Sequence, residues 1–158
     1  MARRIGHITI AAVGKLRATH WQRAQADYVR RLEHYTGFNL IEVKDVVGKS
    51  MPDAVAVAKE GELLLAAASG RRTILLLEEG RLQTSSQMAQ TLRAQLEQFG
   101  HLVFLIGGPL GFDEAVKAAA HDKWALSPFT FTHELARVIL LEQLYRAFTI
   151  LHGEPYHK

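Results

Sequence analysis

The chain has 158 residues, of which 48% are hydrophobic and 22% charged, an ordinary composition for a globular domain. That length supports one hydrophobic core and excludes a second full domain. With no cysteine, the chain can form no disulfide framework, zinc-thiolate site or cysteine nucleophile. No apolar run approaches the roughly 18 residues that span a bilayer, and the opening segment is too polar for a signal peptide. We therefore expect a single-domain cytoplasmic protein with no membrane partner.

Positive charge is concentrated at the start of the chain. The first 31 residues carry seven Lys and Arg side chains against one acid, whereas the other 127 residues sum to −3. A basic segment that includes Trp21 and Tyr28 can neutralise phosphates and stack on unpaired bases. A solvated basic helix face explains the same charges, so both interpretations stay open.

Short β-branched or Leu-rich runs alternate with longer helical periods along the chain, which is typical of a parallel sheet with crossover helices. In chain order the sequence predicts strand 5–13, helix 19–35, strand 38–47, helix 52–68, strand 73–77, helix 85–99, strand 102–106, helix 113–120, strand 123–126 and helix 133–150. The predicted fold class is α/β, with a mostly parallel sheet and helices on both faces.

Two loops follow the carboxyl ends of predicted strands, where α/β folds bind their ligands. One loop, 107–111, begins with a double glycine that lets the backbone approach a ligand closely. The other loop, 127–132, leads to His133. A tight strand-to-helix turn with no ligand is the alternative for the first loop, since it matches neither the dinucleotide fingerprint nor a P-loop.

The last predicted helix is apolar on every side, which indicates burial on every side. We expect its second apolar face to pack against a partner chain, most simply in a symmetric dimer. His133 and Arg137 lie one turn apart on one face, and Glu142 and Arg146 one turn apart on nearly the opposite face. A helix salt bridge is the alternative to a site role for Arg146, and an N-terminal polar residue is the alternative for His133.

The ending, with Tyr156, His157 and Lys158, lies outside any periodic pattern. Such a tail can be a frayed terminus, or it can stack on a base and contact phosphate. The other histidines show no paired spacing with carboxylates of the kind a metal site needs, so we predict no metal.

Several stretches in order carry a family resemblance. They are Leu105-Ile106-Gly107-Gly108-Pro109-Leu110-Gly111, Trp124-Ala125-Leu126-Ser127, Thr132-His133-Glu134-Leu135-Ala136-Arg137-Val138, Glu142-Gln143-Leu144-Tyr145-Arg146-Ala147 and Pro155-Tyr156-His157-Lys158. This series resembles the bacterial ribosomal large-subunit methyltransferase H family of the SPOUT superfamily. The resemblance covers the whole chain and is most specific after residue 102.

The resemblance implies an S-adenosylmethionine-dependent enzyme that methylates N3 of a pseudouridine in 23S rRNA of the assembled 70S ribosome. It also implies a homodimer and a SPOUT-type trefoil knot near the C-terminus, which general topology rules would not suggest.

Site residues follow from the same resemblance. The implied cofactor-binding positions are Leu76, with Leu77 as the alternative register, Gly107, Gly108, Leu126, Ser127, Pro128, Phe129, Thr130 and Phe131. As catalytic hypotheses, His133 is a candidate base or orienting group, while Arg137 and Arg146 bind RNA phosphate or the developing anion. Tyr156 and His157 contact the target nucleotide, from the partner subunit.

Two rival functions stay open. A flavodoxin-like or Rossmann-like nucleotide-binding enzyme fits the alternation of strands and helices, although the expected glycine fingerprint and ribose-binding acid are missing. A non-catalytic ribosome-binding or assembly factor on a methyltransferase scaffold would use the basic N-terminal region alone.

Overall fold

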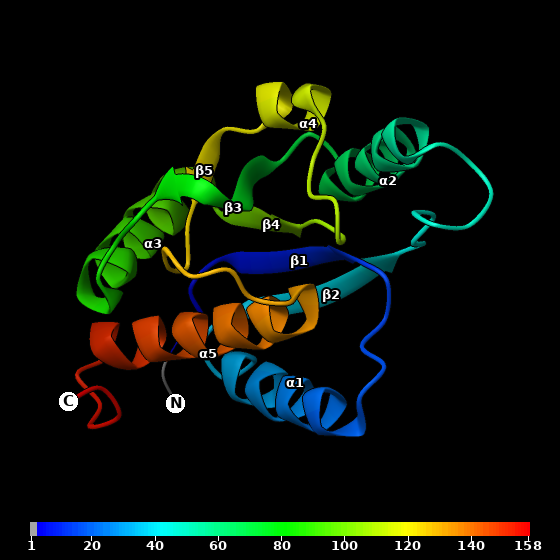
Figure 1. Ribbon diagram of the computed structural model, residues 1–158. Helices are drawn as coiled ribbons and strands as arrows, with labels where there is room; N and C mark the ends of the chain where they lie inside the picture. The colour runs from blue at the N-terminus through cyan, green and yellow to red at the C-terminus, as the bar shows by residue number, and fades with distance from the viewer. Residues whose placement is uncertain (1–2) are drawn as a thin grey trace.

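The computed structural model describes residues 3–158 and has a five-stranded sheet at its centre (Figure 1). The strands are β1 (His7–Val13), β2 (Gly37–Val43), β3 (Arg72–Arg81), β4 (His101–Ile106) and β5 (Asp122–Trp124). They lie in the order β2-β1-β4-β3-β5, and every neighbouring pair is parallel. The predicted parallel sheet is confirmed.

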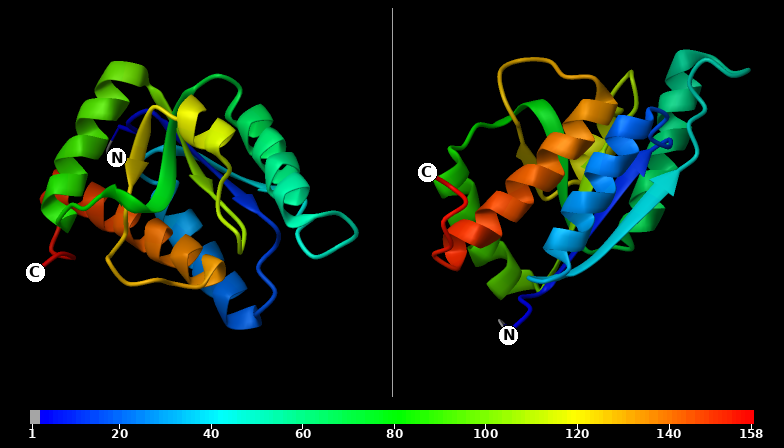
Figure 2. Two further views of the ribbon diagram at one scale, coloured as in Figure 1. Left: turned by 45° about the horizontal axis from the view of Figure 1, so that its top comes forward. Right: turned by 90° about the horizontal axis from the view of Figure 1, so that it is seen from below.

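Five helices cover both faces of this sheet (Figure 2). They are α1 (Thr19–Leu32), α2 (Asp53–Ala68), α3 (Ser85–Phe99), α4 (Glu114–Ala119) and α5 (His133–Leu151). The helices α1, α3 and α5 bury the larger apolar cluster on one face, and α2 and α4 bury the smaller one on the other. The predicted α/β class with helices on both faces is therefore confirmed.

Helix α5 lies between α1 and α3 and contacts both, while its inner residues, such as Leu140 and Leu144, are fully buried. The two flanking helices of the same chain account for most of its apolar perimeter, so this pattern does not by itself require a partner chain. What remains is a half-buried stripe of Leu135, Ile139 and Ile150, which helical spacing places on the outward side. A dimer would use this narrower surface.

Two strand ends differ from the prediction by four residues, and the others agree within two. Strand β2 ends at Val43 rather than at residue 47, because the N–H groups of Val46 and Val47 donate to the buried carboxylate of Glu60 instead of continuing the ladder. Strand β3 continues past residue 77 through a polar, irregular stretch to Arg81, which pairs with Trp124 of β5. Apolar residues at strand spacing in the sequence do not mark either strand end.

No helix within residues 3–158 has the length and apolar character that crossing a membrane demands. The C-terminal trefoil knot implied by the family resemblance stays a prediction.

Candidate active site

A cavity of about 580 Å³ opens at the carboxyl ends of β3 and β4. Most of its walls come from three segments: the end of β3, the glycine loop after β4, and the loop that joins β5 to α5, while α4 and α5 contribute individual side chains. The lining includes eight of the nine positions proposed for the cofactor: Leu76, Gly107, Gly108, Leu126, Ser127, Phe129, Thr130 and Phe131. Pro128 belongs to the same loop but does not line the cavity, whereas Leu77 does.

The loop from Leu126 to Phe131 has unused hydrogen-bonding capacity. Within residues 3–158, its one main-chain hydrogen bond runs from the Phe129 N–H to the Ser127 hydroxyl at 3.0 Å. Among residues 3–158, the peptide groups of Leu126, Thr130 and Phe131 therefore have no hydrogen-bond partner. The apolar side chains of Leu126 and Phe131 line the cavity at the two ends of this loop. Free donors and acceptors next to apolar walls are what a flat heterocycle requires.

Both loop glycines sit where a side chain would crowd the neighbouring segments. A Cβ on Gly107 would lie 3.1 Å from the Gly111 carbonyl oxygen. A Cβ on Gly108 would lie 3.2 Å from Glu60 Oε1 and 3.3 Å from Val13. These short distances explain why glycine occupies both positions: the backbone packs closely against its surroundings at the edge of the cavity.

The cavity also has charged residues that the sequence analysis did not propose. Glu78 and Glu79 follow the buried half of β3, and Lys117 comes from α4, where it is 3.6 Å from Glu114. Their position just beyond the end of the predicted strand 73–77 is the signal that could have identified the two acids, since ligands bind beyond strand ends. They give the cavity both signs of charge.

His133 and Arg137, one turn apart on α5, have different surroundings. His133 is the first residue of the helix, after the Thr132 N-cap, and lines the cavity. Arg137 is 1% exposed, and its guanidinium donates to Glu42 of β2 at 2.5 Å and to the Gly14 carbonyl at 2.9 Å. This placement makes Arg137 a buried link between α5 and the sheet and does not present it to RNA.

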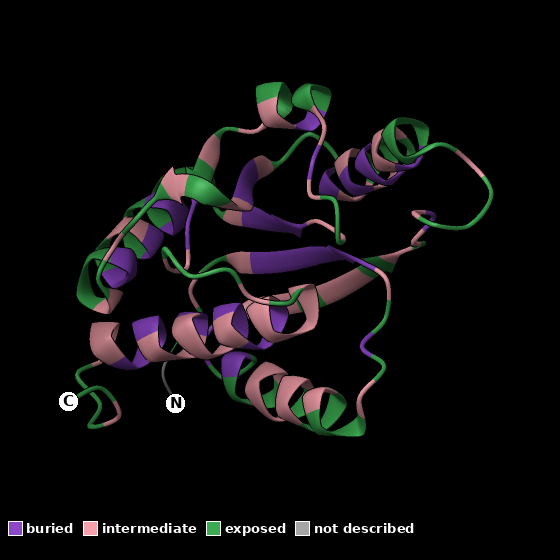
Figure 3. Cartoon of the chain, viewed as in Figure 1, coloured by how far each residue is buried: buried purple, intermediate pink, exposed green. Residues whose placement is uncertain are grey.

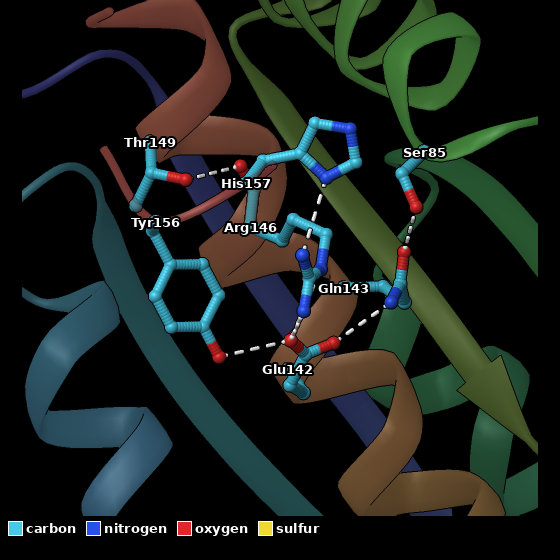
Figure 4. A network of polar contacts seen from close by, with 7 residues as sticks. All are labelled: Ser85, Glu142, Gln143, Arg146, Thr149, Tyr156 and His157. Atoms are coloured by element: carbon cyan, nitrogen blue, oxygen red, sulfur yellow. Dashed lines mark hydrogen bonds and ion pairs between the residues drawn. The ribbon is translucent and has the colours of Figure 1, made fainter. Parts of the chain in front are cut away.

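The C-terminal tail folds back on α5 and forms a polar cluster, drawn in Figure 4. Arg146 Nη2 donates to Glu142 Oε1 at 2.6 Å, and the Tyr156 hydroxyl donates to the same oxygen at 3.0 Å. Arg146 also contacts His157 Nδ1 at 3.1 Å. We call Glu142, Arg146, Tyr156 and His157 the tail cluster; it unites three residues from the sequence hypotheses.

The helix salt bridge considered as an alternative for Arg146 is present, with both partners incompletely buried. The hydrogen bond to Glu142 raises the pKa of Arg146, so the guanidinium stays charged. Burial, followed by the hydrogen bond to Glu142, raises the pKa of Tyr156, so its hydroxyl remains a donor. The tail cluster therefore brings a cation, a phenol and an imidazole together (Figure 4), and Figure 3 shows that the tail itself is exposed or half-buried.

The cavity and the tail cluster stand apart in one chain. Thirteen residues of α5 separate His133 from Arg146, which is roughly 20 Å at the helical rise. Within residues 3–158, no group of three or more His, Asp or Glu side chains could hold a metal ion.

Comparisons with known proteins agree with this arrangement. A family model described as "Predicted SPOUT methyltransferase" matches residues 7–157. A ribosomal RNA large subunit methyltransferase H of Parabacteroides distasonis is 41% identical, covering 95% of this chain and 98% of its own. The protein of that name from Ruminiclostridium cellulolyticum is 40% identical, covering 96% and 99%.

Solved structures support the fold alone. A probable methylase family protein of Haemophilus influenzae has a TM-score of 0.56 at 13% identity, over 96% of this chain and 70% of its own. A probable methyltransferase of Bordetella pertussis has a TM-score of 0.56 at 16% identity, over 89% and 95%. The full-length family match and the 40% identity together show that the chain belongs to the SPOUT methyltransferases, within the ribosomal RNA large subunit methyltransferase H family.

Proposed function

We propose that this protein transfers a methyl group from S-adenosylmethionine to N3 of a pseudouridine in 23S rRNA, with the assembled 70S ribosome as substrate. The observation that carries the proposal is the cavity, where free peptide groups and two crowded glycines meet at the carboxyl edge of the sheet. Its occurrence in a chain of this methyltransferase family supports the choice of cofactor.

The residues present fit S-adenosylmethionine. The volume of about 580 Å³ falls within the range of cofactor sites. The unpaired peptide groups of the 126–131 loop would bind the adenine edge between Leu126 and Phe131, and the glycines would admit the ribose and methionine parts. Glu78 and Glu79 complement the positive charge of the ammonium and sulfonium groups. When bound, the cofactor supplies an electrophilic methyl group.

This chain's own residues handle the proton and the developing charge. An imide nitrogen attacks well only after it loses its proton, and imidazole is suited to accept a proton near neutral pH. His133, which lines the cavity, accepts the N3 proton. Arg146 stabilises the resulting imide anion, while Tyr156 and His157 hold the target nucleotide.

We propose that a second copy of the chain brings the two groups together. Because His133 and Arg146 are separated by roughly 20 Å of helix, a single chain cannot bring both to one reacting nitrogen. In a homodimer that packs through the outward stripe of Leu135, Ile139 and Ile150, the tail cluster of one protomer completes the cavity of the other.

Methyl transfer can be measured directly. Purified protein is incubated with methyl-labelled cofactor and with ribosomes that lack the modification, comparing 70S particles with isolated 50S subunits. Mass spectrometry then locates the label. Labelling of one pseudouridine, strongest in 70S, is the expected result. Cofactor binding without transfer to any ribosomal RNA would refute the substrate, and stoichiometric RNA binding without cofactor use would identify a binding factor instead.

Deleting residues 156–158 tests the role of the tail. We expect methyl transfer to be lost while the chain stays folded and keeps its oligomeric state, because Tyr35 and Glu154, which anchor the tail at 2.6 Å, are retained. The transfer assay, circular dichroism and analytical ultracentrifugation measure these three properties. A deletion variant with the wild-type rate would remove the tail from the mechanism.

A further inference from the structure

A chain of cation–π and aromatic contacts connects the tail cluster to α1. Arg31 lies over the Tyr28 and Tyr145 rings, with its guanidinium carbon 5.8 Å and 5.3 Å from their centres. The Tyr145 ring meets the Tyr156 ring edge to face at 4.7 Å. Arg146 lies over Tyr156 at 4.8 Å. We call Arg31, Tyr28 and Tyr145 the arginine–tyrosine stack; it places a second guanidinium beside the tail cluster.

The guanidinium of Arg31 has donors to spare. Its side chain is 44% exposed, and within residues 3–158 its one acidic partner is Asp27, at 3.3 Å. Arg30 contacts the same carboxylate at 2.6 Å, so Asp27 neutralises Arg31 incompletely. A guanidinium has five N–H donors in a planar fork suited to phosphate, and most of those of Arg31 remain free for a ligand.

The rings hold this guanidinium in place. Tyr28 and Tyr145 are half-buried, one on α1 and one on α5, with their centres 6.2 Å apart. A guanidinium that already contacts two rings and a carboxylate loses less side-chain freedom when it binds a ligand than a free one does. The stack is therefore a preformed binding surface.

We propose that the arginine–tyrosine stack binds the rRNA backbone and an unpaired base beside the target nucleotide, with Arg31 taking the phosphate and the tyrosine rings taking the base. The inference rests on the proposed function and extends its RNA contact from the tail to α1. Proteins recognise unpaired RNA by placing bases on aromatic or guanidinium planes and phosphates on cations, which this surface offers side by side. The net +6 charge of the first 31 residues, which include Arg31, favours a polyanion as the ligand.

Arg30 provides a matched control. It is the sequence neighbour of Arg31 on the same helix, carries the same charge and shares Asp27, but among residues 3–158 no aromatic ring lies beneath it. Arg31→Met, Arg31→Lys and Arg30→Met are compared for equilibrium binding to deproteinised large-subunit rRNA and to 50S and 70S particles at several salt concentrations. Circular dichroism establishes that each variant is folded. If Arg31→Met destabilises the chain, Arg31→Lys keeps the charge and still removes the guanidinium.

We expect Arg31→Met to raise the Kd for rRNA roughly tenfold and to reduce the salt slope by roughly 0.7, as for one lost contact with a single-strand phosphate. Arg31→Lys keeps the salt slope but loses part of the affinity, since an ammonium has no plane to stack on. Arg30→Met changes neither quantity, and the Kd for S-adenosylmethionine stays constant throughout.

Three results separate the explanations. Equal effects of the Arg30 and Arg31 variants would overturn the proposal, because the helix would then act as uniform charge. Weaker binding to ribosomal particles with unchanged binding to bare rRNA would also overturn it and assign the surface to a ribosomal protein. A wild-type protein that binds rRNA through Arg31 but transfers no methyl group would refute the proposed function and leave this inference standing.

Discussion

Replacing Arg137 by Met tests whether this residue is a structural link or an RNA ligand. The substitution keeps an apolar stem but leaves Glu42, whose side chain is 27% exposed, without its cation. Removing one partner of a buried ion pair costs about 3–5 kcal/mol. Glu42 retains contact with water, and Arg137 Nε has no partner within residues 3–158, so we expect the lower end, about 3 kcal/mol. At about 2–4 °C per kcal/mol for a chain of this size, the thermal midpoint falls by about 6–12 °C.

Thermal unfolding is followed by far-ultraviolet circular dichroism at constant protomer concentration. The control is Arg17→Met, because Arg17 is 79% exposed and lies 3.6 Å from Asp45, so its loss costs less than about 1 kcal/mol. The double variant Arg137→Met/Glu42→Leu should recover part of the stability, since no unpaired charge remains. An unchanged midpoint for Arg137→Met together with lost rRNA binding would refute the structural role and restore the RNA-binding hypothesis.

Three further outcomes are expected. Arg146→Ala lowers methyl transfer roughly 100-fold without changing the Kd for the cofactor, because Arg146 acts on the imide anion and does not line the cavity within its own chain. Reduced stability with full activity would assign Arg146 to its salt bridge alone. Gly108→Ala places a Cβ 3.2 Å from Glu60 Oε1. Calorimetry should show roughly tenfold weaker cofactor binding, which corresponds to about 1.4 kcal/mol. Unchanged affinity would exclude the glycine loop from the cofactor site. Burial, followed by Coulombic repulsion from His7 and Arg71, lowers the pKa of His101 from 6.5 to about 4. The folded state is therefore fully stable above pH 6.5 and loses stability as the pH falls toward 4. His101→Gln should flatten this dependence, and equal midpoint-versus-pH curves for both proteins would contradict it.

Local pattern was sufficient to predict the elements of the fold. All ten predicted strands and helices are present, because a buried parallel strand and a crossover helix leave different apolar periods in the chain. The carboxyl-edge rule for α/β folds indicated both loops of the cavity, since it depends on chain order alone. The ends of β2 and β3 were harder to place, because they are set by Glu60 and by Trp124, each distant in sequence.

The roles of the polar residues on α5 depend on tertiary contacts. His133 and Arg137 look alike in the sequence, one turn apart on one helix face, yet one lines the cavity and the other is buried against Glu42, 95 residues away. The spacing of Glu142 and Arg146 indicates an ion pair, but only the folded tail adds Tyr156 and His157 to it, and only the packing of α1 beside α5 places Arg31 nearby. Periodicity along a chain records which side of an element is apolar. The partner that a polar side chain meets is decided by long-range packing, which leaves no local signal in the sequence.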